Sequence, residues 1–225
     1  MIMKTEIVKY NKEWEKLYRA EAKKIKKELG KNCVSVQHIR DTSFKCDVCA
    51  VNRKIELRVM ATVKKIDDIS ADALLELGYG QTSDGYKKEG DIDTILWIRS
   101  AENLDGKDEI LRETSLRDYL VSHPEKAKAY AEYKAKCAED TDDISKIEEA
   151  TENFFDALRP EIDKWTKEQY NISMGISLGM CFGMSIGLAI GSAMGNTALG
   201  MTTGMSIGMC LGIALAYSKN KNNNG

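Results

Sequence analysis

Two closely spaced cysteines, Cys46 and Cys49 in the segment CDVC, have the spacing that most directly suggests chemistry. A CxxC pair can form a redox-active disulfide or supply half of a zinc site. The other four cysteines form no second pair, and no His-x-x-x-His sequence accompanies them. The pattern therefore favours reduced thiols in a cytosolic loop, because disulfides are rare in that compartment.

The elements that would position reactive side chains follow from hydrophobic periodicity. Apolar residues at helical spacing predict a helix over 11–29, with Asn11 in the capping position and Gly30 at its end. Alternating and β-branched residues predict strands at 33–39, 54–63 and 94–100. Because side chains alternate along a strand, Glu56 and Arg58 share one face of the second strand and are expected to pair.

Further helices complete the predicted layout. Ser70 is expected to cap a short helix that ends just before Gly78, and three longer helices follow at about 107–121, 123–139 and 142–169. The sequence Ser122-His-Pro-Glu125 has the form of a capping box with Pro124 in the first turn, which marks the start of the second long helix. An early mixed sheet followed by several helices is an α+β layout.

Charge divides the chain into two kinds of sequence. No Lys, Arg, Asp or Glu occurs from Gln169 to Ser218, although the whole chain has 33 basic and 35 acidic residues. We therefore expect a charged domain over 1–168, an apolar segment over 169–218 and a polar tail over 219–225. The net charge of −2 gives no basis for nucleic-acid binding. The first ten residues lack the apolar core of a secretory signal.

Glycines recur at every fourth position of the apolar segment. They are Gly175, Gly179, Gly183, Gly187, Gly191 and Gly195, and then Gly200, Gly204, Gly208 and Gly212. Each would cost about 1 kcal/mol relative to alanine in a helix exposed to water. In lipid, unsatisfied backbone groups enforce the helix, and a row of glycines forms a surface on which another helix can pack closely. The rows therefore predict helix packing and self-association within a membrane.

The two glycine-rich stretches, 172–194 and 199–217, each have close to the roughly 20 residues that cross a bilayer. The segment GNTAL between them suits a tight hairpin, and lysines flank the pair on one shared side. By the positive-inside tendency that side is cytoplasmic, which would place the charged domain at the inner face of the membrane. The alternatives are a soluble helical pair buried between subunits and a segment of low complexity without fixed structure.

Three segments of the charged part resemble the GrpB family, whose fold is nucleotidyltransferase-like. They are IVKYNKEWEKLYRAEAKKIKKELG (7–30), VQHIRDTS (36–43) and LRDYLVSHPEKAKAYAEYKAKCA (116–138). They occur in the family's order and spacing, and the resemblance extends over roughly residues 5–165. The resemblance implies a mixed sheet with flanking helices, and the glycine rows predict that a two-helix glycine-rich transmembrane hairpin follows it.

The resemblance also implies a site. In that fold a Gly-Ser-Thr-Ser turn lets nucleotide phosphates approach the backbone, and a carboxylate on the next strand binds Mg²⁺. In this sequence the turn is Arg40-Asp41-Thr42-Ser43, so Arg40, Thr42 and Ser43 are the implied phosphate contacts. Glu56 is the implied metal ligand and catalytic residue. The turn has no glycine, and Arg58 would repel a cation at Glu56.

Other residues of this region have structural interpretations of equal or greater weight. His38 can orient the turn, but a histidine at the end of a buried strand more often makes a structural hydrogen bond. The hydroxyls of Thr42 and Ser43 can donate to phosphate or cap the turn itself.

Three functions follow from these observations. The first is a membrane-tethered cytoplasmic domain whose degenerate nucleotide and metal pocket serves as a binding or regulatory module. The second is an active nucleotidyltransferase that uses Glu56, with Mg²⁺ and a nucleotide as its ligands. The third is an oligomerising membrane protein held together by its glycine rows. The expected partners are the lipid bilayer and further copies of the chain, and the sequence leaves enzymatic activity open.

Overall fold

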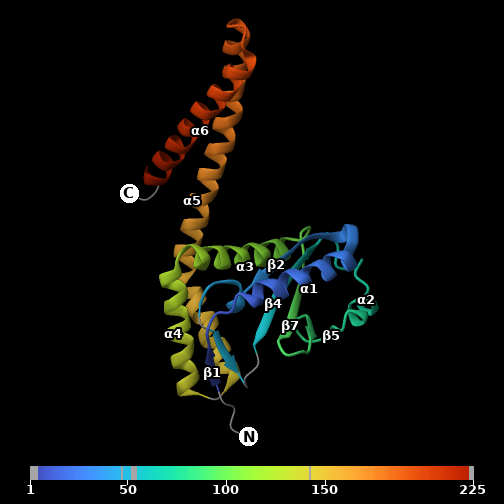
Figure 1. Cartoon of the computed structure of the whole chain (residues 1–225). Helices are drawn as coiled ribbons and strands as arrows, with labels where there is room; N and C mark the ends of the chain where they lie inside the picture. The colour runs from blue at the N-terminus through green and yellow to red at the C-terminus, as the bar shows by residue number, and fades with distance from the viewer. Residues whose placement is uncertain (1–4, 47, 52–54, 142, 223–225) are drawn as a thin grey trace. The chain divides into compact units, whose positions relative to one another are not determined.

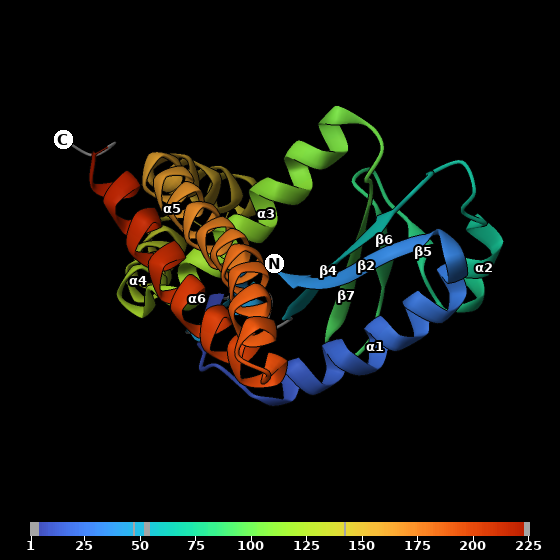
Figure 2. The ribbon, with the colours of Figure 1, turned by 90° about the horizontal axis from the view of Figure 1, so that it is seen from above.

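The computed structural model describes residues 5–46, 48–51, 55–141 and 143–222 (Figure 1). The chain separates into two compact units, Met1–Arg159 and Pro160–Gly225. The first unit contains a five-stranded mixed sheet with the order β2-β4-β7-β6-β5 (Figure 2). Its strands are β2 (Cys33–Ile39), β4 (Glu56–Val63), β5 (Gly80–Gln81), β6 (Tyr86–Lys88) and β7 (Asp93–Ser100). A separate antiparallel pair joins β1 (Thr5–Val8) to β3 (Val48–Val51).

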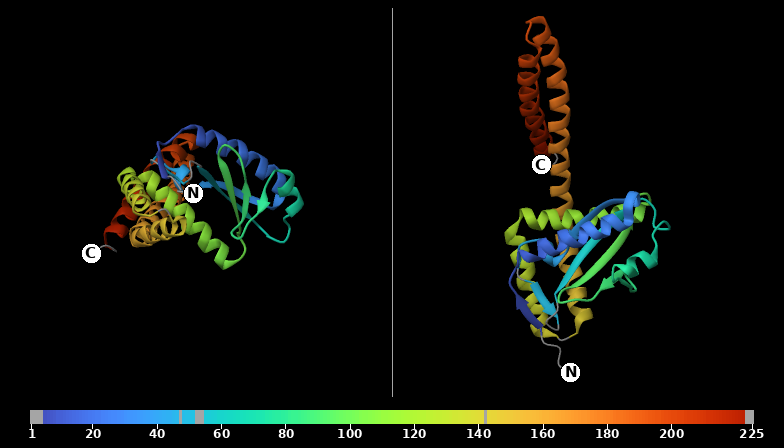
Figure 3. Two further views of the ribbon diagram at one scale, coloured as in Figure 1. Left: turned by 90° about the horizontal axis from the view of Figure 1, so that it is seen from below. Right: turned by 45° about the vertical axis from the view of Figure 1, so that its right-hand side comes forward.

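The two central strands, β4 and β7, are parallel, whereas the other neighbours in the sheet are antiparallel. Their side chains alternate between two faces. Leu57 and Val59 of β4, with Leu96 of β7, belong to the core beneath α1 (Glu13–Leu29) and α2 (Ala71–Glu76). Figure 3 shows α1 running along this face. The opposite face therefore presents the alternate residues, among them Arg58 and Trp97.

A second core holds α3 (Leu104–Ser122), α4 (Pro124–Asp140) and the first turns of α5 (Ile144–Ala193). Its centre is Tyr130 of α4, which is 1% exposed. The Tyr130 ring lies with its centroid 4.7 Å from that of Phe155 on α5 and 6.0 Å from that of Phe44, which follows the turn after β2. Aromatic packing thus ties α4 and α5 to the end of β2.

The predicted strands and the first helix are confirmed to within two residues, and Ser70 caps α2 by accepting a hydrogen bond from the Ala73 amide. The predicted capping box is wrong. Ser122 is the last residue of α3, and His123 is the N-cap of α4 without a side-chain capping hydrogen bond. The His123 ring instead contacts the Tyr119 carbonyl oxygen at 2.8 Å, because α3 continues into the residues expected to cap α4.

The predicted helix over 142–169 and the first predicted membrane span are parts of one 50-residue helix, α5, with Pro160 inside it. A second long helix, α6 (Thr197–Asn222), follows. Within the second unit the two glycine rows face each other in antiparallel order. A Cβ atom built on Gly175, Gly179, Gly183 or Gly187 would overlap the carbonyl oxygen of Gly212, Gly208, Gly204 or Gly200, respectively. The helices therefore pack backbone against backbone, as glycine-lined helix pairs do.

The last glycine of the first row has a different role from the one predicted. Gly195 was expected in the helix contact, but a Cβ atom there would meet nothing within 4 Å. It has φ 71° and follows the end of α5, where the amides of Gly195 and Asn196 donate to the carbonyls of Ser192 and Gly191. This is a Schellman termination, which favours glycine. Asn196 then caps α6 by accepting from the Leu199 amide at 3.1 Å.

Several polar side chains of the hairpin make hydrogen bonds within the hairpin itself. The hydroxyls of Ser177, Ser185, Thr202 and Ser206 each donate to the carbonyl four residues earlier. At the open end of the hairpin, the Asn171 amide donates to Asn220 at 2.6 Å. Hydroxyls bonded in this way suit a helix that has no water beside it.

Replacement of Gly183 by leucine should destabilise the hairpin by about 3 kcal/mol, because the side chain would meet the backbone of Gly204 rather than a movable side chain. Ala189→Leu adds similar bulk at an exposed position of the same helix and is the matched control. Unfolding of both variants in detergent micelles, followed by circular dichroism, measures the difference. Equal stability of the two would contradict the observed packing.

Candidate functional site

A strained turn at the end of β2 organises the site. Arg40 has φ 63° and ψ −159°, the only positive φ at a non-glycine residue of the described chain. This region of backbone space is populated almost exclusively by glycine and costs of order 1–3 kcal/mol for other residues. The backbone therefore keeps a glycine-type conformation at the position where the sequence has arginine.

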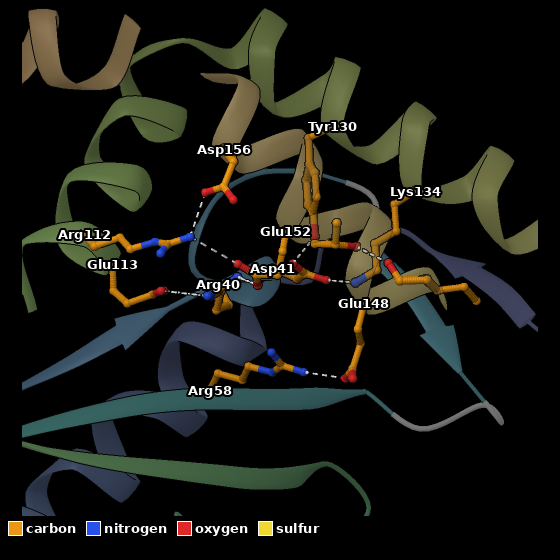
Figure 4. A network of polar contacts seen from close by, with 12 residues as sticks. Arg40, Asp41, Arg58, Arg112, Glu113, Tyr130, Lys134, Glu148, Glu152 and Asp156 are labelled. Atoms are coloured by element: carbon orange, nitrogen blue, oxygen red, sulfur yellow. Dashed lines mark hydrogen bonds and ion pairs between the residues drawn. The ribbon is translucent and has the colours of Figure 1, made fainter. Parts of the chain in front are cut away.

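The Arg40 side chain explains how this conformation is held (Figure 4). Its Nε and Nη2 atoms donate to the two carboxylate oxygens of Glu113 on α3, both at 2.7 Å, and Nη1 donates to Glu152 on α5 at 2.6 Å. The guanidinium lies between the rings of Trp97 and Phe155, 5.4 and 5.3 Å from their centroids. Burial alone would lower the Arg40 pKa, but Glu113 and Glu152 raise it. Carboxylates thus take three of the five N–H donors, and only 8% of the side chain is exposed to an approaching phosphate.

The next residue, Asp41, is also engaged within the protein. Its carboxylate accepts a hydrogen bond from the Tyr130 hydroxyl at 2.6 Å and forms an ion pair with Lys134. Burial acts to raise the Asp41 pKa, but Lys134 and Tyr130 outweigh it and hold the pKa at about 2. Burial and the Asp41 charge together raise the Tyr130 pKa well above its ordinary value. Asp41 is thus an anion that fastens the turn to α4.

The two hydroxyls predicted to contact phosphate make hydrogen bonds inside the turn. The hydroxyl oxygen of Thr42 lies 2.9 Å from His38 Nε2, and the hydroxyl of Ser43 donates to the Arg40 carbonyl oxygen at 2.6 Å. His38 stacks on Tyr18 with ring centroids 4.7 Å apart. Burial and the nearby Arg117 lower the His38 pKa to about 4, so the ring is neutral near pH 7. These contacts favour the structural interpretation of His38, while the phosphate roles of Thr42 and Ser43 stay predictions.

The predicted pairing of Arg58 with Glu56 is confirmed. Arg58 Nη2 lies 3.0 Å from Glu56 Oε2 and 3.6 Å from Glu148 of α5. Burial acts to lower the Arg58 pKa, but Glu56 and Asp41 raise it. A cation bound at Glu56 would therefore lie beside a permanent positive charge.

A cavity of about 370 Å³ lies over this face of the sheet. Its lining includes five carboxylates and three cationic side chains. They are Asp41, Glu56, Asp84, Glu148 and Glu152, and Arg40, Arg58 and Lys134. Within the described residues, no three His, Cys, Asp or Glu side chains converge as a metal site would require. Most of these charges are paired: Arg40 with Glu152, Arg58 with Glu56 and Glu148, and Lys134 with Asp41.

Several residues of this network were not anticipated. Glu113, Glu152 and Trp97 lack a local sequence signal, whereas Tyr130 and Lys134 are four residues apart in the segment YAEYK and therefore share a helix face. Cys46 is buried and its thiol contacts the Asp41 carbonyl oxygen at 3.8 Å. The Cys49 side chain lies outside the described residues, so a role for the CxxC pair stays a prediction.

Comparison with known proteins identifies the first unit. The sequence profile described as GrpB protein matches residues 4–161. The chain belongs to the GrpB family. Among curated proteins, the UPF0157 protein YqkA of Bacillus subtilis (strain 168) is 25% identical over 173 residues, which are 75% of this chain and 50% of that protein. This GrpB chain thus spans about half the length of the curated relative that it matches.

A solved structure supports the GrpB fold. The crystal structure of the conserved protein GrpB from Enterococcus faecalis aligns with a TM-score of 0.51 at 23% identity. The alignment covers 68% of this chain and 99% of the E. faecalis chain. At this identity the likeness concerns the fold alone. Nearly all of that GrpB protein thus corresponds to about two thirds of this chain.

Truncation of Arg40 should destabilise the GrpB domain by about 3–5 kcal/mol, because Arg40→Ala leaves Glu113 buried without its partner. Arg40→Gly should be less damaging than Arg40→Ala by about 1 kcal/mol, since glycine relieves the backbone strain. Urea unfolding followed by tryptophan fluorescence compares them. Arg112→Ala, which removes exposed pairs with Asp156 and Glu152 but leaves the buried Arg40–Glu113 pair in place, is the control and should cost about 1 kcal/mol or less. Equal stability of the glycine and alanine variants would contradict the strain.

Stability of the GrpB domain should fall as the pH decreases from about 6.5 to 4. The folded state holds His38 neutral down to about pH 4, so the unfolded chain binds one more proton across this window. The free energy of unfolding therefore decreases by roughly 3 kcal/mol over the window. The variant His38→Gln should lose this slope while it keeps a polar partner for Thr42. An unchanged slope in a folded His38→Gln protein would assign the pH dependence to other groups.

Proposed function

We propose that the chain is a membrane-anchored GrpB domain whose charged cavity acts as a binding or regulatory module. The observation that carries the first part of this proposal is the nature of α5 and α6. Both are long and apolar enough to cross a membrane, and only 11% of the most apolar stretch of each helix is buried. Phe182 and Leu215 are 67% and 72% exposed. Such side chains are stable in hydrocarbon and costly in water.

The ends of the hairpin support one orientation. Tyr170 and Tyr217 are 61% and 60% exposed at its open end, where Lys219 and Lys221 follow. Tyrosine and lysine are typical of the membrane–water interface, and lysine is enriched on the cytoplasmic side. The closed end, Met194 to Asn196, carries no charge. In this proposal both ends of the hairpin face the cytoplasm, and the GrpB domain lies there too.

A binding role is favoured over turnover by the state of the cavity. Arg40, Asp41 and Arg58 each form ion pairs that link different elements. Catalysis of nucleotidyl transfer would require a free carboxylate for a metal and an approachable turn for phosphates. In this chain Arg40, Asp41 and Arg58 are held in ion pairs that stabilise the fold. A ligand entering the cavity would therefore meet a charged surface that can form hydrogen bonds.

The transferase alternative has one observation in its favour, since Glu56 lines the cavity and its side chain is 38% exposed. Titration of the full-length protein with nucleoside triphosphates, with and without Mg²⁺, separates the two functions. The proposal predicts no product, and no loss of binding in Glu56→Gln. Mg²⁺-dependent product formation that Glu56→Gln abolishes would establish the transferase instead.

Self-association of the chain stays a prediction, but the glycine rows no longer provide the surface for it. The glycine rows contact each other within one chain, so further copies would have to use other faces of α5 and α6.

Membrane attachment should depend on residues 169–225. The full-length chain should sediment with membranes and resist extraction at high pH, whereas a chain ending at residue 168 should stay in the supernatant. The comparison is made by fractionation and immunoblotting of the two chains expressed at the same level. Recovery of the full-length chain in the soluble fraction would refute the anchor and favour a helical pair buried between subunits.

A further inference from the structure

An apolar groove runs along one side of the α5–α6 hairpin. It has a volume of about 580 Å³, and glycines of both helices form its floor. Its walls are rows of large side chains at four-residue spacing, Leu178, Phe182 and Ile186 on α5 and Ile207, Leu211 and Leu215 on α6. The exposed fractions of these six side chains range from 51% to 72%. The groove is therefore open from the side, and the hairpin itself does not fill it.

The end of the groove that lies at Asn171 and Lys219 differs from the rest. Lys219 and Asn171 line it there, and Lys219 is the one charged residue among the described residues of the lining. Asn171 is already bonded to Asn220, which fixes its amide. Lys219 has no ion pair within the described residues, and its ammonium can donate three hydrogen bonds. The groove thus combines a long apolar channel with one cation at the end expected to lie at the interface.

We propose that an anionic phospholipid occupies this groove, with its phosphate at Lys219 and an acyl chain between the two rows of side chains. The inference rests on the membrane anchor proposed above. One leaflet of the hydrocarbon core is about 15 Å thick, which corresponds to about ten residues of helix. An acyl chain from the interface would therefore extend past Met174 and Leu178 to about Phe182 on α5, opposite Leu215, Leu211 and Ile207.

A second copy of the hairpin fits the groove less well. Two copies in the same orientation would be related by a two-fold axis along the membrane normal, and such an interface places the same patch on both sides. A groove would then face a groove and leave it unfilled, and the two Lys219 side chains would approach each other. A lipid with a negative headgroup is complementary in both shape and charge.

The lipid preference is measured by native mass spectrometry of the full-length protein in mild detergent with equal amounts of phosphatidylglycerol and phosphatidylcholine. The wild type should retain phosphatidylglycerol over phosphatidylcholine by about fivefold. Lys219→Gln should reduce this ratio to about one, whereas Lys221→Gln, two residues away and outside the groove lining, should keep it. An equal loss in both variants would show a diffuse attraction to the basic tail and overturn the site.

Filling the groove tests the acyl-chain position. Leu178→Trp should remove adducts of both lipids, whereas Leu188→Trp, at a residue that is 47% exposed but outside the groove lining, should not. Circular dichroism of both variants checks that their helices are intact.

Dimers without bound lipid would assign the groove to a second copy of the chain. A membrane-bound chain without lipid preference would refute this inference alone, whereas a soluble chain would refute the anchor.

Discussion

The contact between Arg40 and Glu113 is the interaction on which the first unit depends. It holds a backbone conformation that glycine would adopt without strain, and it does so at the point where β2 turns toward the helices. Because Glu113 lies on α3 and the second partner, Glu152, on α5, the same guanidinium joins three elements that are distant in sequence. The energy of these ion pairs offsets the strain, and the side chain fills space that a glycine would leave open. One residue thus combines a backbone constraint with a tertiary anchor.

Neighbouring interactions extend this arrangement into a layer of charge between the sheet and the helices. Asp41 is fixed by Lys134 and Tyr130, and Arg58 by Glu56 and Glu148. Trp97 lies at the centre of this layer, with the guanidinium groups of Arg40, Arg58 and Arg99 each within 6 Å of its ring. Buried charges are costly unless each has a partner, and this requirement makes the network interdependent. The charged side chains that line the cavity are consequently held in place by these ion pairs.

The sequence predicted the fold well where local periodicity determines it. Alternation along residues 33–39 and 94–100 marks strands that are half buried, and helical spacing marks α1. The short strands β5 and β6 were missed because turn-forming and charged residues dominate their segment; β6 is held by pairing with β7, and β5 by pairing with β6. The continuity of α5 could not be predicted from composition, since one half of the helix is charged and the other is apolar.

The site was harder to predict than the fold, because Glu113 and Glu152 lie 73 and 112 residues from Arg40 and no spacing rule connects them. The pairing of Glu56 with Arg58 was predictable because it is local to one strand.

The facing glycine rows leave one question that the repeat itself does not answer, which is the alignment of α5 with α6. Because both rows repeat every four residues, sliding one helix by a single turn, about 6 Å, would again bring glycine opposite glycine. The interface is thus degenerate, and close packing alone would accept more than one alignment. Two features that do not repeat remove the degeneracy: the tight turn at Gly195 and Asn196, and the bond between Asn171 and Asn220 at the other end. The alignment of α5 with α6 is therefore determined at the two ends of the hairpin. The glycine rows between them contribute close packing but do not select one alignment.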